Sequence, residues 1–220
     1  MGLALIKARL AQAERAAGRA EGSVTLIAVS KVQPNARVEA VLRDGHRVFG
    51  ENYVQETAGK WPEWRAEFPD AQVHMIGPLQ TNKAKQALDL FDAIHTLDRS
   101  SLVKKLATLA QARGACPDIF VQVNTGSEPQ KAGVLPDELD GFLKDVIAAD
   151  LPVRGLMCIP PEGDDPMPHF NALGQMAARN GLSGLSMGMS SDFEAAVAAG
   201  ATHIRVGSAL FGARDYGHQS

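Results

Sequence analysis

One lysine, Lys31, stands where an apolar run of the chain ends, in the stretch "LIAVSKVQPN". A lysine ammonium is strongly hydrated and usually lies on a helix surface, so a place at the end of a buried strand costs free energy unless the amine is used. Once deprotonated, such an amine can attack an aldehyde and form a Schiff base. Lys31 is therefore a candidate for covalent attachment to a carbonyl compound.

Two loops near the carboxyl terminus carry residue types that suit an anion. Ser190 follows one apolar segment, and Gly207 and Ser208 follow the next. Each loop leads into a predicted helix, whose first N–H groups and positive end attract negative charge. Ser191 and Glu194 have the spacing of a capping box at the first of these helices, so Ser191 is as well explained by a cap as by a ligand. The two loops together predict a phosphate site.

Arg205 lies two residues before Gly207 in the same predicted strand, so both residues face the same region. Two interpretations are open. Arg205 forms a structural salt bridge that closes the fold, or it is a fixed cation that faces a bound ring or acid.

Asn52, His74 and His95 are polar residues near the ends of other predicted strands. Asn52 either lines the same site or, with Gln55, caps the helix that follows. A metal site would need several converging imidazoles and carboxylates, and the chain has no His-x-His pair. We therefore expect the two histidines to be hydrogen-bonded core or rim residues, and no metal.

The elements that position these residues alternate regularly along the chain. Eight apolar segments, each followed by a helical pattern with three- and four-residue spacing, favour repeated strand–helix units and hence parallel strands. The segments are "VTLIAVS", "RVFGEN", "VHMIGP", "AIHTLD", "IFVQVN", "VRGLMCIP", "GLSMGMS" and "HIRVGS". An open doubly wound sheet is the alternative, but no strand is followed by a dinucleotide-binding glycine pattern.

We predict a single (β/α)8 TIM barrel domain over residues 1–220, with an additional N-terminal helix within 1–20 and a flexible tail at 213–220. In such a barrel strand eight neighbours strand one. The candidate residues then gather at the mouth formed by the carboxyl ends of the strands, where ligands bind.

The composition favours a small-molecule partner. The 220 residues carry a net charge of -3, with 22 basic and 25 acidic side chains spread without blocks, which gives no surface for nucleic acid or membrane. The first residues form neither a signal peptide nor a membrane span. We expect a cytoplasmic monomer.

Six blocks of sequence resemble the pyridoxal phosphate homeostasis protein family, whose members are similar to the barrel domain of alanine racemase. The blocks are "AVSKVQP", "FGENYVQE", "HMIGPLQTNK", "VNTGSEPQKAG", "GLMCIPP" and "LSMGMSSDFEAAVAAGATHIRVGSALFG". The likeness runs from about Leu26 to Gly212. One departure from the family pattern is a short, acidic, proline-rich stretch that we predict to be a surface loop at 161–168.

The resemblance implies that the cofactor is pyridoxal 5'-phosphate, joined to Lys31 as an aldimine. It implies that Ser190, Gly207 and Ser208 hold the phosphate and that Arg205 faces the pyridine nitrogen, with Asn52 in the pocket. It also implies a carrier that supplies the cofactor to apo-enzymes within the cell.

Two enzymatic alternatives stay open: a small amino-acid racemase that uses the same cofactor, and a lysine aldolase without it. A two-base racemase needs a second proton donor, and the chain has only Tyr53 and Tyr216 as tyrosines. We therefore expect a carrier without catalytic activity of its own.

Overall fold

The eight apolar segments predicted as strands all form strands in the computed structural model of the chain, which describes residues 2–212. Most of their residues are buried, because helices cover the outside of the sheet and side chains fill its inside. The strands are β1 (Thr25–Val29), β2 (Val48–Glu51), β3 (Gln72–Met75), β4 (Ala93–Leu97), β5 (Asp118–Val123), β6 (Val153–Cys158), β7 (Gly184–Ser186) and β8 (His203–Val206).

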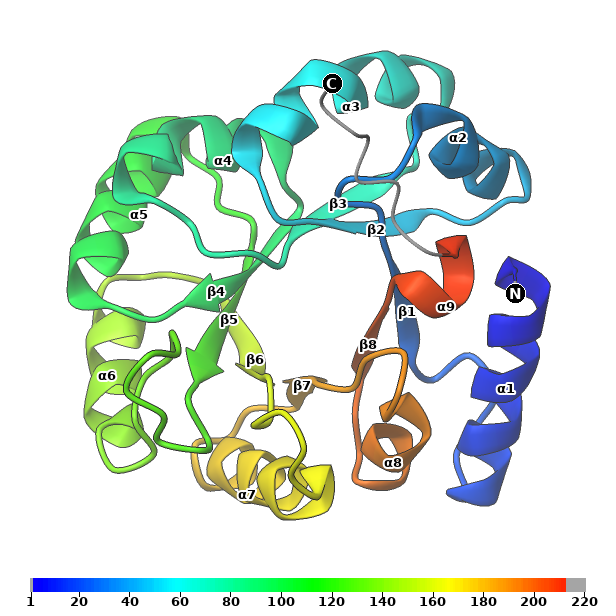
Figure 1. The fold of residues 1–220 in the computed structure, drawn as a ribbon. Coiled ribbons are helices and arrows are strands. Elements are labelled where there is room, and N and C mark those ends of the chain that lie inside the picture. The colour runs from blue at the N-terminus through cyan, green and yellow to red at the C-terminus, as the bar shows by residue number, and fades with distance from the viewer. Residues whose placement is uncertain (1, 213–220) are drawn as a thin grey trace.

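The sheet closes on itself. Each strand pairs in parallel with the next, and β1 pairs with β8, from Thr25 opposite His203 to Ala28 opposite Val206. The predicted (β/α)8 barrel is therefore confirmed, and the alternative open sheet is wrong. Figure 1 shows the ring of strands with the helices arranged around its outside. Because all the strands are parallel, their carboxyl ends share one mouth of the barrel and their amino ends share the other.

The helices follow the strands as predicted, with one correction to a predicted loop. They are α1 (Leu3–Ala16), α2 (Asn35–Arg43), α3 (Val54–Glu67), the 3-10 turn η1 (Thr81–Lys83), α4 (Ala84–Leu90), α5 (Ser100–Arg113), α6 (Leu139–Ala148), α7 (Pro166–Arg179), α8 (Phe193–Ala198) and α9 (Ser208–Phe211). The N-terminal helix α1 lies within the predicted range 1–20 and ends at Ala16, and Gly18 then turns the chain with a left-handed φ of 68°.

The correction concerns the predicted loop at 161–168, which overlaps the start of α7. Asp165 caps this helix, and its carboxylate accepts a 3.0 Å hydrogen bond from the Met167 N–H. Pro166 takes the first helical position, where its missing N–H and fixed φ do no harm. The proline-rich composition therefore indicated a helix start as well as a loop, and the irregular part ends at Asp165.

Helix α1 is fixed across the seam where β1 meets β8, beside α8 and α9 (Figure 1). Its buried Glu14 accepts hydrogen bonds from the backbone N–H groups of Gly22 at 3.0 Å and Val24 at 2.7 Å, just before β1. Arg9 pairs with Glu194 of α8 at 2.6 Å. These bonds set the entry of the chain into β1, the strand that leads to Lys31.

Among residues 2–212 no helix is long and apolar enough to cross a membrane. The tail at 213–220, which we predict to be flexible, lies outside the described residues, as does Tyr216.

Candidate functional site

Lys31 lies in the turn that follows β1, at the carboxyl-end mouth of the barrel, and is half-buried. The next residue, Val32, has a φ of 56°, in the left-handed region that β-branched residues rarely adopt. Its N–H donates a 2.8 Å hydrogen bond to Glu56 Oε1 in the first turn of α3. A contact with the neighbouring strand–helix unit thus holds the turn in a strained conformation and sets the position of the lysine backbone.

A buried carboxylate fixes the other side of the same turn. Glu51, the last residue of β2, is fully buried, and its Oε1 accepts hydrogen bonds from Ser30 Oγ at 2.7 Å and Trp61 Nε1 at 3.0 Å. The Lys60 ammonium lies 3.3 Å from the same oxygen. Burial raises the pKa of the Glu51 carboxyl, and Lys60 is the main influence in the other direction. The residue before Lys31 is therefore anchored to a charged, buried cluster.

The predicted phosphate residues meet between the loops after β7 and β8. Ser190 Oγ lies 3.4 Å from the Gly207 N–H nitrogen, 3.4 Å from that of Ala209 and 3.5 Å from Ser208 Oγ. These distances are at the long limit for hydrogen bonds, and one hydroxyl oxygen has too few lone pairs for three donors. An anion with several acceptor oxygens fits this group of donors better than the single hydroxyl does. The structure thus brings Ser190, Gly207 and Ser208 together and adds the backbone of Ala209.

These donors lie beside β1, the strand that leads to Lys31. Gly207 approaches β1 closely, because a Cβ atom added to Gly207 would lie 3.4 Å from Val29 Cβ. Val29 is the last residue of β1, and the register pairs its neighbour Ala28 with Val206. The lysine turn and the donors of the two closing loops therefore share one corner of the mouth.

Arg205 is buried in the barrel interior, with 4% of its surface exposed. Its Nη1 donates to Ser186 Oγ and its Nη2 to the Cys158 backbone oxygen, both at 2.8 Å. Within residues 2–212 no carboxylate lies within ion-pair distance of Arg205, so the alternative of a structural salt bridge is wrong for the described part of the chain. Burial lowers the pKa of Arg205. A buried cation held by neutral acceptors is costly, and an anionic or acceptor-rich ligand would offset that cost.

Asn52 follows β2 at the same mouth, where its backbone passes close to Gly77. A Cβ atom at Gly77 would lie 2.5 Å from the Asn52 carbonyl oxygen, so only glycine fits there. Tyr53 precedes α3 with no side-chain cap, and Asn52 Oδ1 is buried without a hydrogen-bond partner. Capping with Gln55 is thus wrong. Asn52 lines a separate cavity of about 280 Å³ that also contacts Lys83, and its role toward a cofactor stays a prediction.

The predicted capping box at α8 is also wrong. Asp192, not Ser191, precedes the helix, and its Oδ1 accepts a 2.6 Å hydrogen bond from the Met189 N–H. Glu194 forms an ion pair with Arg9 instead. Ser191 is exposed, which leaves Ser190 as the serine of this loop that faces the donors of α9.

His74 and His95 lie within β3 and β4, and both are buried and hydrogen-bonded, as predicted for core histidines. In the part of the chain that the structure describes, no three His, Cys, Asp or Glu side chains are arranged to hold a metal ion.

Two residues of this region were missed from the sequence, namely Glu51 and Ser186. Both are polar residues inside segments that are otherwise buried, and a buried polar group needs partners. That mismatch was a usable signal, although the partners themselves come from distant segments.

Comparison with known proteins gives a consistent result. The family model of the alanine racemase N-terminal domain matches residues 3–215. The pyridoxal phosphate homeostasis protein of Pseudomonas aeruginosa is 40% identical over 223 residues, which cover 98% of this chain and 95% of that protein.

Solved structures of PipY from Synechococcus elongatus have the same fold. The form without pyridoxal phosphate has a TM-score of 0.82 and 39% identity, over 92% of this chain and all of that one. The form with pyridoxal phosphate bound has a TM-score of 0.79 and 38% identity, over 91% of this chain and 99% of that one.

Proposed function

This chain belongs to the alanine racemase N-terminal domain family and, within it, to the pyridoxal phosphate homeostasis proteins, and from that premise we propose that it binds pyridoxal 5'-phosphate and controls its supply. The proposal includes transfer of the cofactor to apo-enzymes in the cytoplasm. We also propose that the protein acts as a monomer.

The observation that supports this function best is the shared corner of the barrel mouth. The turn of Lys31 and the donors of Ser190, Gly207, Ser208 and Ala209 lie beside one another, with Arg205 in the neighbouring interior. Pyridoxal phosphate supplies an aldehyde that condenses with a primary amine, a ring nitrogen and an anionic tail. Each of these three groups finds a complementary group of the protein in this region.

Each residue then has a separate task. Lys31 supplies the amine, and the bonds of its neighbours to Glu51 and Glu56 hold it at the mouth. Ser190 and the backbone of Gly207 donate to the phosphate oxygens, as charge-assisted hydrogen bonds that are stronger than those between neutral groups.

Arg205 sets the electronic character of the site. A permanently charged donor opposite a ring nitrogen keeps that nitrogen unprotonated, which weakens the electron withdrawal needed to stabilise a carbanion. Arg205 thus favours holding the cofactor over broad amino-acid chemistry.

Borohydride trapping tests the site. Purified protein loaded with pyridoxal phosphate should show a visible absorbance band, and reduction should place a stable pyridoxyl label on the peptide that contains Lys31. Lys31→Ala should lose the band and the label while keeping its far-UV circular dichroism. Lys105→Ala, on the exposed face of α5, is the matched control and should behave as the wild type. A label on another lysine in the wild type would overturn the proposed site.

A second experiment separates a carrier from an enzyme. Loaded protein is incubated in heavy water with each amino acid, and α-proton exchange is followed by NMR. We expect no exchange above the rate of free cofactor, together with recovery of activity when an apo-enzyme is added. Sustained exchange with any amino acid would contradict the carrier function and favour the racemase-like alternative.

A further inference from the structure

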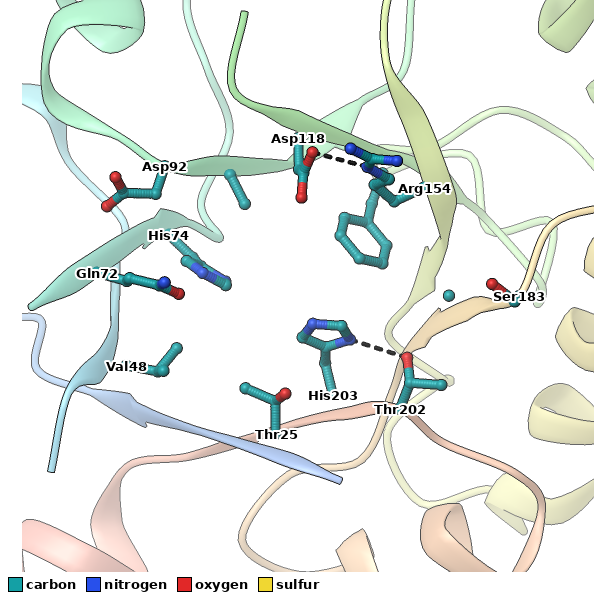
Figure 2. Close-up of a pocket in the computed structure, with 13 residues that line it drawn as sticks. Thr25, Val48, Gln72, His74, Asp92, Asp118, Arg154, Ser183, Thr202 and His203 are labelled. Atoms are coloured by element: carbon teal, nitrogen blue, oxygen red, sulfur yellow. Dashed lines mark hydrogen bonds and ion pairs between the residues drawn. The ribbon is translucent and has the colours of Figure 1, made fainter. Parts of the chain in front are cut away.

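A cavity of about 470 Å³ opens at the amino-end mouth of the barrel, opposite the mouth that holds Lys31 (Figure 2). It is lined by the first residues of the strands, among them Thr25, Gln72 and Asp118. Figure 2 shows His74 and His203 pointing into this cavity, with the ion pair of Asp118 and Arg154 at its edge. The proposed function uses none of these groups.

A line of hydrogen bonds runs from this cavity through the barrel interior to Arg205. His74 Nδ1 lies 3.1 Å from His95 Nε2, and His95 Nδ1 lies 2.8 Å from Ser186 Oγ. Ser186 Oγ in turn accepts the 2.8 Å hydrogen bond from Arg205 Nη1. All four side chains are buried, and the His95 ring stacks on Phe120 with 4.3 Å between ring centroids. The line therefore crosses the closed interior from one mouth toward the other.

The chemistry of these groups fixes the direction of every hydrogen bond. A guanidinium only donates, so Ser186 Oγ accepts from Arg205, and the Ser186 hydroxyl hydrogen has only His95 Nδ1 to receive it among the described residues. Burial lowers the pKa of His74 to about 3 and that of His95 well below its usual value, so both rings are neutral at neutral pH. Neutral His95 then donates from Nε2 to His74 Nδ1, and His74 carries its own proton on Nε2.

We propose that Ser186, His95 and His74 form a positioning column that fixes the Arg205 guanidinium toward the cofactor ring and links it to the amino-end cavity. The proposal rests on the proposed function, because the ring nitrogen is the partner assigned to Arg205. Ser186 and Cys158 O are two fixed acceptors, and two acceptors define the plane of a guanidinium. Because both acceptors are neutral, the positive charge of Arg205 stays available to a ligand. A carboxylate partner would instead neutralise that charge.

The cofactor-free protein gives the first test. In ¹⁵N-histidine NMR spectra of the wild type, we expect His95 to carry its proton on Nε2 and to show one sharp tautomer. Ser186→Ala should remove that preference, whereas Ser183→Ala, the same substitution at the edge of the cavity, should leave it unchanged. A wild-type His95 protonated on Nδ1 would overturn the proposed column whether or not the protein binds the cofactor.

The second test uses pyridoxal phosphate labelled with ¹⁵N in its ring. Ser186→Ala should move the ring ¹⁵N signal and weaken binding about tenfold, the loss of roughly one charge-assisted hydrogen bond. His95→Phe, which retains a ring against Phe120, should act in the same direction. His95→Asn, whose amide can replace Nδ1 toward Ser186 but cannot reach His74, should have a smaller effect, and Ser183→Ala should have none.

The outcomes distinguish the column from the proposed function. A ring ¹⁵N signal unchanged in Ser186→Ala, with Lys31 still labelled by borohydride, overturns the column and leaves the function standing. Absence of cofactor binding in the wild type overturns the function instead. Circular dichroism and urea unfolding identify a variant that has lost its fold, and for such a variant the histidine spectrum of the wild type still decides.

Discussion

The Ser30 hydroxyl donates a 2.7 Å hydrogen bond to the Glu51 carboxylate, which joins the end of β1 to the end of β2 directly before Lys31. The carboxylate is fully buried and also accepts from Trp61, while its second oxygen, Oε2, has no hydrogen-bond partner. A buried carboxylate is costly unless hydrogen bonds and a nearby cation offset the cost. Through the bond to Ser30, these contacts of Glu51 also hold the lysine turn in place.

Glu51→Gln should therefore slow the capture of pyridoxal phosphate by Lys31, in addition to lowering the stability of the fold. The amide keeps one acceptor for Ser30 but removes the charge that Lys60 faces, and we expect about 1–3 kcal/mol less stability toward urea. The rate of growth of the visible band after mixing measures capture.

Glu39→Gln is the matched control for this prediction. Glu39 also accepts a hydrogen bond from an indole, that of Trp64 at 3.3 Å, but it lies on α2 away from the lysine turn. Equal rates of capture in the two variants would show that Glu51 acts on stability alone.

Ser190→Ala should weaken pyridoxal phosphate binding about tenfold and leave the binding of pyridoxal, which lacks the phosphate, unchanged. Ser190 is the residue that approaches the donors of Gly207 and Ala209. Ser191→Ala provides the control, because the neighbouring serine is exposed and lies outside this contact. Equal losses for the two ligands would place Ser190 away from the phosphate.

The sequence predicted the barrel well because buried parallel strands leave a strong local signal. Segments such as "IFVQVN" are mostly apolar and almost wholly buried, and the helical periods between them are regular. The helix starts were predicted less well. Asp192 and Asp165 precede their helices, whereas the spacing of Ser191 and Glu194 suggested a cap that the ion pair of Glu194 with Arg9 prevents.

The candidate site divides in the same way. Lys31 and Ser190 were predicted from residue type and position at strand ends, which are local features. The column from His74 to Arg205 joins β3, β4, β7 and β8, and the bond between His95 and Ser186 spans 91 residues of sequence. Such partners depend on how the barrel closes, and no local pattern contains that information.

Acid should destabilise the protein through its buried neutral histidines. Burial lowers the pKa of His46 to about 4, so the unfolded chain takes up a proton below about pH 6.5 that the folded protein does not. The folded protein keeps the full contribution of His46 to its stability above pH 6.5, the pKa of His46 in the unfolded chain. It loses this contribution as the pH falls from there toward 4. For this one residue the loss is on the order of 3 kcal/mol.

Urea unfolding from about pH 8 down to about pH 5 measures this effect. His46→Gln can keep the 2.8 Å hydrogen bond to the Val48 carbonyl, because its amide nitrogen takes the place of Nε2. The variant should show a stability curve less steep by about 1.4 kcal/mol per pH unit below pH 6.5. Parallel curves for the two proteins would contradict the assignment of this proton to His46.

Gly188 is the glycine of the Ser190 loop whose replacement should be most harmful. Its φ is 93°, and an added Cβ would lie 2.6 Å from Ala196 Cβ and 3.0 Å from Phe193 Cα of α8. The Gly188 carbonyl also accepts a 2.9 Å hydrogen bond from the Arg205 N–H, so a shift of this residue disturbs the loop and the strand together. Gly188→Ala should cost about 2–4 kcal/mol in urea unfolding and weaken pyridoxal phosphate binding. Gly174→Ala, inside α7 with its nearest neighbour at 3.9 Å, should instead add about 0.5–1 kcal/mol of stability and leave binding unchanged, and equal stability of the two variants would show that the loop can move aside.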